Sequence, residues 1–215
     1  MGLKEKMVVV TGFGPFGEHS VNASWEAVKL LPSLALDEEL GLRLHVEEVS
    51  VAYDAVSSQV PRLWQALEPA LVVHVGVSSV ATDVVLESCA HRAGYVKQDV
   101  CGKVPLDGQC CNGSTEKIIS DIDVELISKK VNESNIGVAT SVSRNAGRYL
   151  CEYIYYTSLC INNLRCIFVH VPPLGKPYSA QELARALKEI IKVIVQNMDQ
   201  FEGRRCDATC DKNVL

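Results

Sequence analysis

Cys151 and His170 lie in sequence contexts that are typical of a cysteine nucleophile and its base. Cys151 ends the stretch 144–151, RNAGRYLC, and His170 ends the stretch 166–170, CIFVH, nineteen positions later. The first stretch predicts the start of a helix and the second predicts the end of a strand. Cysteine nucleophiles and their bases are commonly presented in this way, so the pair predicts a cysteine hydrolase.

The residues before Cys151 favour a reactive thiol. Ala146 and Gly147 are small and permit a sharp entry into a helix, which would place Cys151 in the first turn. The helix dipole and the unpaired N–H groups favour an anion at that position. Arg148 would act in the same direction if its side chain turned inward. The competing interpretation is an inert core residue, because free cysteine is often buried and this chain has nine cysteines.

His170 and Glu87 are the predicted partners of the thiol. His170 follows an apolar run and precedes Pro172 and Pro173, at the kind of strand end where α/β proteins form ligand crevices. A neutral imidazole there could take a proton from the thiol and later give it to a leaving amine. Glu87 follows the apolar segment 84–86, so we expect its carboxylate to turn inward and bond the His170 ring. A structural histidine and a surface glutamate are the alternatives.

A glycine-rich loop follows the first predicted strand. Its sequence over 11–17 is TGFGPFG. Phe13 and Phe16 are costly in a polar loop unless they cover something, which predicts an apolar slot. The same letters match the dinucleotide fingerprint G-x-G-x-x-G. This alternative ranks lower because the phenylalanines and Pro15 would crowd a pyrophosphate, and no acidic residue ends a second strand at the expected spacing of roughly 20 residues.

Composition limits the class of protein. The chain has 215 residues, 47% of them hydrophobic, and 21 Lys and Arg against 26 Asp and Glu give a net charge of −5. Without a basic cluster, no nucleic-acid partner is predicted. No stretch approaches the roughly 20 apolar residues of a membrane span, and no signal peptide is recognised. We therefore expect no membrane association, a cytoplasmic location and reduced cysteines.

Apolar runs alternate with segments of helical period, which is typical of an α/β sheet covered by helices on both faces. We expect one catalytic domain over 1–201 and a flexible tail over 202–215. The polar, glycine-bearing segment 90–114 predicts a loop or hairpin. The predicted strands cover 7–11, 42–51, 71–75, 84–89, 136–143 and 165–170, and the predicted helices cover 24–31, 52–67, 115–131, 147–160 and 179–200.

Together these motifs resemble the pyroglutamyl-peptidase I family of cysteine peptidases, in its vertebrate form. The resemblance extends from about 7 to 200 and rests on GFGPFG at 12–17, Asn22, Glu87, AGRYLC at 146–151 and HVPP at 170–173. It implies a three-layer α/β/α sandwich with a mixed, mostly parallel central sheet. It also implies the site residues, with Cys151 as nucleophile, His170 as base, Glu87 as orienting acid, and Phe13 and Phe16 around the lactam ring.

The activity that this resemblance implies is removal of an N-terminal pyroglutamyl (5-oxoprolyl) residue from peptides through a thioester. The expected partners are peptides with N-terminal pyroglutamate, and the oligomeric state stays open. Val77 stands where bacterial members have a glutamine, and Arg92 is the nearest candidate for their site arginine but receives no role. A catalytically weak paralogue that keeps the fold for binding, and a dinucleotide-binding oxidoreductase, are the alternatives.

No metal or cofactor is predicted. Cys166 and His170 lie four positions apart on a predicted strand. This spacing places both side chains on the same face of the strand, but too far apart to bind one zinc ion. No CxxC pair accompanies them.

Overall fold

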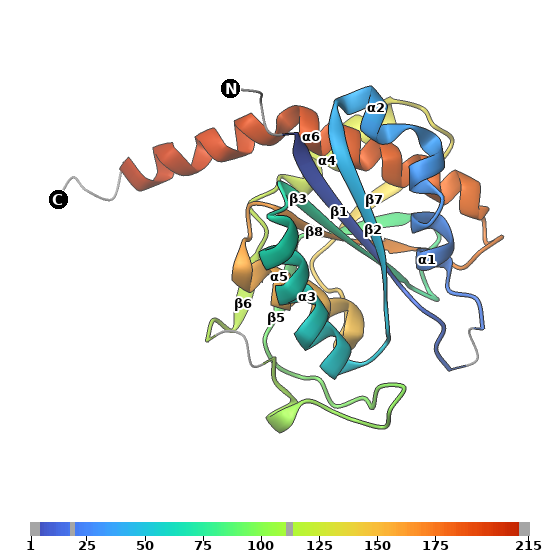
Figure 1. Ribbon diagram of the computed structural model, residues 1–215, viewed down its shortest axis with the longest axis vertical. Coiled ribbons are helices and arrows are strands. Elements are labelled where there is room, and N and C mark those ends of the chain that lie inside the picture. The colour runs from blue at the N-terminus through green and yellow to red at the C-terminus, as the bar shows by residue number, and fades with distance from the viewer. Residues whose placement is uncertain (1–4, 18–19, 111–113, 211–215) are drawn as a thin grey trace.

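Buried runs of Val, Ile and Leu form a six-stranded sheet at the centre of the molecule (Figure 1). The computed structural model describes residues 5–17, 20–110 and 114–210. All neighbouring strands of this sheet are parallel except β4 and β8, which confirms the expected mixed, mostly parallel arrangement. In spatial order the strands are β2 (Leu42–Val49), β1 (Lys6–Phe13), β3 (Leu71–Val77), β8 (Cys166–Val171), β4 (Val84–Glu87) and β7 (Thr140–Ser143).

Helices cover both faces of the sheet, as Figure 1 shows. One face carries α1 (Ala23–Val28), α2 (Leu36–Leu40), α4 (Val124–Glu133) and α6 (Ala180–Cys210). The other face carries α3 (Tyr53–Leu67) and α5 (Leu150–Ile161). Two 3₁₀ helices span Leu31–Leu34 and Leu106–Gly108. The molecule is thus the three-layer α/β/α sandwich that the resemblance implied.

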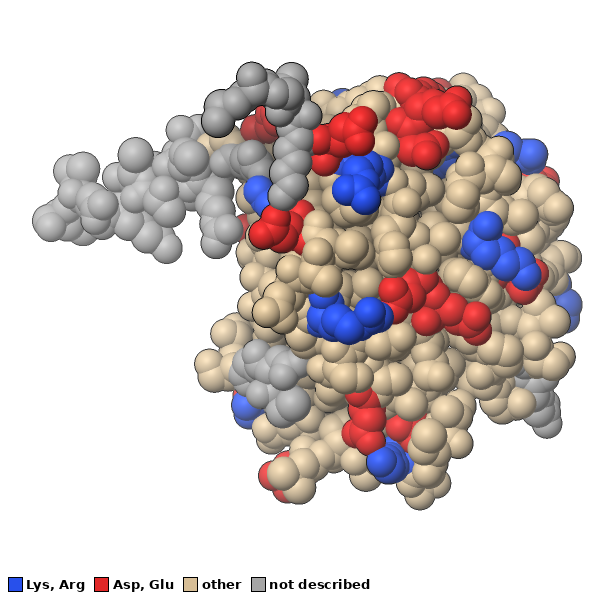
Figure 2. Space-filling view, in the orientation of Figure 1, with Lys and Arg blue, Asp and Glu red and all other residues tan. Residues whose placement is uncertain are grey.

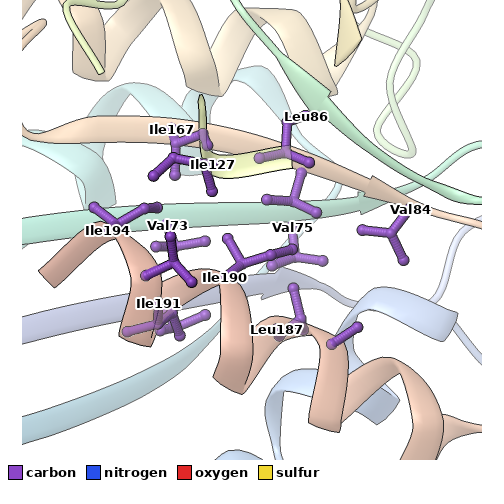
Figure 3. Close-up of a cluster of buried hydrophobic side chains, with 14 of the residues drawn as sticks. Val73, Val75, Val84, Leu86, Ile127, Ile167, Leu187, Ile190, Ile191 and Ile194 are labelled. Atoms are coloured by element: carbon purple, nitrogen blue, oxygen red, sulfur yellow. The ribbon is translucent and has the colours of Figure 1, made fainter. Parts of the chain in front are cut away.

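Alternation along the buried strands divides the core into two parts and decides which side chains reach the site. In β8, Ile167 and Val169 pack toward α6, whereas Phe168 packs toward α5. His170 therefore points to the same side as Phe168. Figure 3 shows the α6 side, where the labelled side chains of the sheet and α4 meet the helix. They are Val73, Val75, Val84, Leu86, Ile127 and Ile167, and they face Leu187, Ile190, Ile191 and Ile194.

The end of the predicted strand 84–89 and the start of the predicted helix 115–131 are wrong. The segment after β4 leaves the sheet, and β5 (Cys89–His91) pairs antiparallel with β6 (Lys117–Ile119), where the sequence predicted the start of a helix. The helix α4 begins later because the Asp123 carboxylate accepts a hydrogen bond from the Leu126 N–H at 3.0 Å. Apolar residues at 118, 119 and 122 fit a strand end and a helix face equally well, so their spacing could not decide.

The last helix is longer than predicted. The sequence predicted an end near 200, but α6 continues to Cys210 and extends past the sheet (Figure 1). The single-domain organisation and the flexibility of 202–215 stay predictions, and 211–215 lie outside the described residues.

No helix in the described part of the chain is long and apolar enough to cross a membrane. Figure 2 shows Lys and Arg interspersed with Asp and Glu on the face in view.

Candidate active site

Cys151 is the second residue of α5, at the carboxyl edge of the parallel strands. The chain reaches this helix through Gly147, whose φ of 86° is a backbone conformation that suits glycine. Tyr149 is the N-cap in an extended conformation, and its side chain caps no N–H group. The first turn of α5 therefore keeps its unpaired N–H groups beside the partly exposed sulfur.

Gly76 of β3 makes room for the sulfur. A Cβ atom on Gly76 would lie 2.8 Å from Sγ of Cys151 and 2.8 Å from Cζ of Phe168. Both distances are too short for real carbon contacts, so only glycine allows α5 to lie this close to the sheet. Sequence reasoning missed this residue, although a glycine inside a buried strand run often marks a close approach.

His170 and Glu87 are bonded to each other beside Cys151. Nδ1 of His170 lies 2.8 Å from Oε1 of Glu87, and the two residues are only 8% and 2% exposed. The antiparallel register of β4 and β8 places Val85 opposite His170, so Glu87 lies diagonally across from the ring. The backbone carbonyl of Glu87 accepts a hydrogen bond from the Tyr155 hydroxyl at 2.9 Å, which ties β4 to α5.

The charges around His170 hold its ring in the protonated form. Burial lowers the pKa of His170, but the adjacent Cys151 sulfur and the Glu87 carboxylate both raise it, to about 10. With Nδ1 committed to Glu87, Nε2 is the ring nitrogen that remains for Cys151. A cation beside the sulfur is the electrostatic setting in which cysteine nucleophiles work.

Cys151 lies where two cavities meet. The larger cavity is an open cleft of about 730 Å³ that also includes His170 and Glu87. The smaller is a narrow slot of about 50 Å³, walled almost entirely by apolar and aromatic side chains. The structure thus brings together all five side chains that the sequence singled out. The slot is lined by Phe13, Phe16, Asn22, Val51, Val77, Tyr149, Leu150 and Cys151.

Arg148 does not turn toward the thiol as the sequence allowed. One guanidinium nitrogen donates to Oδ1 of Asn145 at 2.9 Å and to Oε2 of Glu152 at 2.7 Å. Glu152 is fully buried, and its other oxygen lies 2.9 Å from Nδ1 of His91. Burial raises the pKa of Glu152 despite these two partners. Arg148 therefore helps to fix the start of α5 and the β5 segment, and sequence reasoning missed Glu152 altogether.

Comparison with known proteins agrees with this geometry. Residues 6–196 match the family described as pyroglutamyl peptidase. The chain belongs to this family. Human pyroglutamyl-peptidase 1 is 49% identical over 93% of this chain and 94% of its own length. Human pyroglutamyl-peptidase 1-like protein is 34% identical over 81% of this chain and 88% of its own length.

Solved structures of this family share the fold. Pyrrolidone carboxyl peptidase from Thermus thermophilus has a TM-score of 0.75 at 26% identity and covers 86% of this chain and 98% of its own. A mutant pyrrolidone carboxyl peptidase from P. furiosus has a TM-score of 0.78 at 23% identity, and it covers 88% of this chain and 98% of its own. The structural likeness extends over nearly the whole chain.

Membership of the pyroglutamyl peptidase family overturns the dinucleotide alternative, and the glycine loop gives the physical reason. A Cβ atom on Gly12 would lie 2.8 Å from Cα of Trp25, and one on Gly14 would lie 2.5 Å from a carboxylate oxygen of Glu48. The close approaches are thus made to the protein itself. The Asn22 side chain accepts from the Ser24 N–H at 3.1 Å, so it already caps the helix end that would face a pyrophosphate.

Val77 and Arg92, the two positions that the sequence analysis compared with bacterial members, have different surroundings. Val77 lines both the cleft and the slot. Arg92 lines neither the cleft nor the slot, and its Nε lies 3.6 Å from the Glu116 carboxylate.

In the described part of the chain, no group of three or more His, Cys, Asp or Glu could hold a metal ion. Six cysteines are free thiols: Cys89, Cys101, Cys110, Cys151, Cys160 and Cys166.

Proposed function

We propose that this chain is a cysteine exopeptidase that removes an N-terminal pyroglutamyl residue from peptides. The observation that carries the proposal is the apolar slot of about 50 Å³ that opens onto Cys151, beside the bonded His170 and Glu87. The activity named for its human relative, at 49% identity, supports the same function. The partners are therefore peptides that begin with pyroglutamate.

Cys151 is the nucleophile and His170 is its proton partner. The sulfur attacks the acyl carbonyl carbon that joins pyroglutamate to the next residue, and a carbon–sulfur bond forms. The carbon–nitrogen bond to the next residue breaks as the proton on Nε2 of His170 passes to the leaving amine. Water then adds to the thioester while the neutral ring takes its proton. Pyroglutamate leaves as the acid, and the sulfur and the imidazolium are restored.

Glu87 orients the ring throughout both steps. Its Oε1 holds Nδ1 at 2.8 Å, which directs Nε2 toward the sulfur and stabilises the imidazolium. The oxyanion of each tetrahedral intermediate is stabilised by N–H groups in the first turn of α5, which the Tyr149 side chain leaves uncapped.

The slot explains why pyroglutamate is accepted and ordinary amino termini are refused. A pyroglutamyl residue has a lactam in place of the charged α-amine, so its ring enters an apolar slot without stranding a cation. The Asn22 amide is already engaged, since its nitrogen donates to the Gly14 carbonyl at 2.9 Å. Val77 offers no polar side chain, so we assign the lactam N–H and C=O to backbone groups around the slot.

The bonded His170 and Glu87 and the open slot favour an active enzyme over a paralogue that keeps the fold only for binding. A reduced sulfur is required for this chemistry. We therefore also propose that the enzyme works in the cytoplasm, where thiols are kept reduced.

Hydrolysis of a chromogenic pyroglutamyl amide by the reduced protein tests the proposal. We expect turnover, its loss in Cys151→Ala, and its retention in Cys101→Ala, because Cys101 is an exposed thiol outside both cavities. Iodoacetamide should inactivate the enzyme and label Cys151 first. The matching glutaminyl amide, which carries a free α-ammonium group, should not be cleaved. Absence of turnover by folded, reduced protein would reject the proposal.

A further inference from the structure

Asp83 directly precedes β4, and its carboxylate lies on the same wall of the cleft as that of Glu87. Asp83, Val85 and Glu87 all line this cleft. The residues between them, Val84 and Leu86, point to the opposite face and are buried toward α6 (Figure 3). The period of two thus gives β4 one apolar face in the core and one face directed at the site.

His170 stands between these two carboxylates. Val85 is paired with His170 across the antiparallel β4–β8 ladder, and Asp83 and Glu87 lie two positions to either side of Val85. Diagonal neighbours across an antiparallel pair, such as Glu87 and His170, are separated by about 7 to 8 Å, and their Cβ atoms by somewhat less. Glu87 uses this spacing to bond the ring at 2.8 Å. Asp83 lies on the other side of the ring, toward the loop 78–82 that forms another wall of the cleft.

Asp83 carries an uncompensated charge. Within the described residues, its half-buried carboxylate makes no hydrogen bond or ion pair, whereas the charge of Glu87 is balanced by His170. Besides Asp83 and the bonded pair of Glu87 and protonated His170, the cleft is lined by Lys97, which is exposed and likewise has no ion pair in the described part. Lys97 lies on the slot side, because its neighbour Gln98 accepts a hydrogen bond at 3.1 Å from Tyr149, which lines the slot.

The proposed reaction sets the path of the peptide between these walls. With the pyroglutamyl ring in the slot and its carbonyl at Cys151, the leaving amine must lie beside His170. The slot is narrow, so the residues that follow pyroglutamate occupy the open cleft. The first of them therefore enters the cleft that Asp83, Val85 and Glu87 line.

We propose that Asp83 is a specificity-determining residue that favours a cationic side chain, Lys or Arg, at the position directly after pyroglutamate. This inference rests on the proposed function of the same site. A half-buried carboxylate attracts a nearby cation more strongly than a fully solvated group does, because the effective dielectric constant is lower. Lys97 opposes this preference weakly, since its ammonium group is exposed and screened by water.

Three peptides that differ only after pyroglutamate test the proposal, with Lys, Gln or Glu in that position and an identical neutral remainder. For the unmodified enzyme we expect kcat/KM in the order Lys, Gln, Glu. In Asp83→Asn the Lys-to-Glu ratio should fall about fivefold, and it should fall similarly in the unmodified enzyme when salt is raised to about 0.5 M. Asp83→Glu should keep the order. The ratio does not depend on how much of a variant folds.

Asp199→Asn is the matched control because it makes the same change in net charge. Asp199 is exposed near Lys6, the first residue of β1, whereas the site lies at the carboxyl ends of the parallel strands. The Asp199 variant should therefore keep the Lys-to-Glu ratio. A ratio unchanged in Asp83→Asn, or a preference for Glu in the unmodified enzyme, would overturn the inference. Failure to cleave any pyroglutamyl substrate would instead reject the proposed function, so the two failures are distinguishable.

Discussion

Gly76 of β3 and Cys151 of α5 are in contact so closely that a single added carbon does not fit, since a Cβ atom on Gly76 would lie 2.8 Å from Sγ. The sulfur is thus positioned by the sheet as well as by its own helix. This contact also places Cys151 on the side of the sheet where His170 points. The height of α5 above the sheet therefore sets the distance between the nucleophile and its base.

Gly76→Ala should abolish most of the activity. The added methyl group must push away Cys151, Phe168 or both, and a displacement of about 1 Å at a reacting atom can cost about a hundredfold in rate. We expect kcat on a pyroglutamyl amide to fall by about that factor. Gly203→Ala is the control, because a Cβ there meets nothing within 4 Å. Full activity in Gly76→Ala would contradict the proposed role of this contact.

Glu87→Gln should change the pH dependence of the reaction as well as its rate. The pKa of His170 is raised to about 10, so the imidazolium persists below that pH and is lost as pH rises through it. Without the Glu87 carboxylate, this upper limit should move to lower pH. We also expect kcat to fall about a hundredfold or more, because the ring loses its orienting partner.

The profile of kcat/KM between pH 6 and 11 measures this shift. The free energy of unfolding should change with pH in the same direction. Folding raises the pKa of His170, so His170 stabilises the folded protein below its usual pKa of about 6.5, and this contribution is lost as pH rises toward 10. Glu189→Gln, on the opposite face of the sheet, is the control. An alkaline limit that stays in place in Glu87→Gln would show that Glu87 does not act on His170.

Much of the site could be predicted because its residues interrupt clear patterns. His170 ends a buried apolar run, Cys151 follows a small-residue entry into a helix, and Glu87 follows an apolar segment, which favours an inward carboxylate. Each local pattern states where a side chain points. Because the carboxyl ends of parallel strands meet at one edge of a sheet, these patterns were enough to expect the three groups together.

The remaining features depend on contacts between distant segments. The closeness of Gly76 to Cys151, and the bonds that draw Arg148 toward Glu152, follow from how α5 sits on the sheet, which no local spacing encodes. The β5–β6 pair was missed for a similar reason, since short apolar segments fit a strand or a helix equally well. The charge on Asp83 was visible in the sequence, but its lack of a partner was not.

Phe16→Ala should weaken substrate binding more than it slows the chemistry. Phe16 lines both the slot and the cleft and is partly buried, so its loss removes a wall that the pyroglutamyl ring would contact. Burial of such a side chain contributes about 1.5 to 3 kcal/mol, so KM should rise about tenfold or more while kcat changes less. Leu106→Ala, at an exposed apolar residue outside both cavities, should leave KM in place. An unchanged KM in Phe16→Ala would argue against the slot as the binding site.

A buried histidine behind the site should govern stability in acid. His74 of β3 lies 2.7 Å from the Thr11 hydroxyl through Nδ1 and 2.6 Å from the Ser158 hydroxyl through Nε2, and the Trp64 indole donates to the same Ser158 oxygen at 3.0 Å. These bonds join β1, β3, α3 and α5. Burial lowers the pKa of His74 to about 3. The folded protein therefore keeps this ring neutral, whereas an unfolded chain protonates it below about pH 6.5.

The free energy of unfolding should accordingly decline as pH falls from about 6.5 toward 3, by up to about 1.4 kcal/mol per pH unit from this one group. Urea unfolding at pH 7, 6, 5 and 4 measures the decline. His74→Gln should be less stable at pH 7 by about 1 to 3 kcal/mol, because buried hydroxyl groups lose their partner, and its pH slope should be shallower by about one proton. His45→Gln, at a partly exposed histidine paired with Glu47, should keep the slope attributed to His74. If His74→Gln has the slope of the unmodified protein, the acid sensitivity of the fold lies elsewhere.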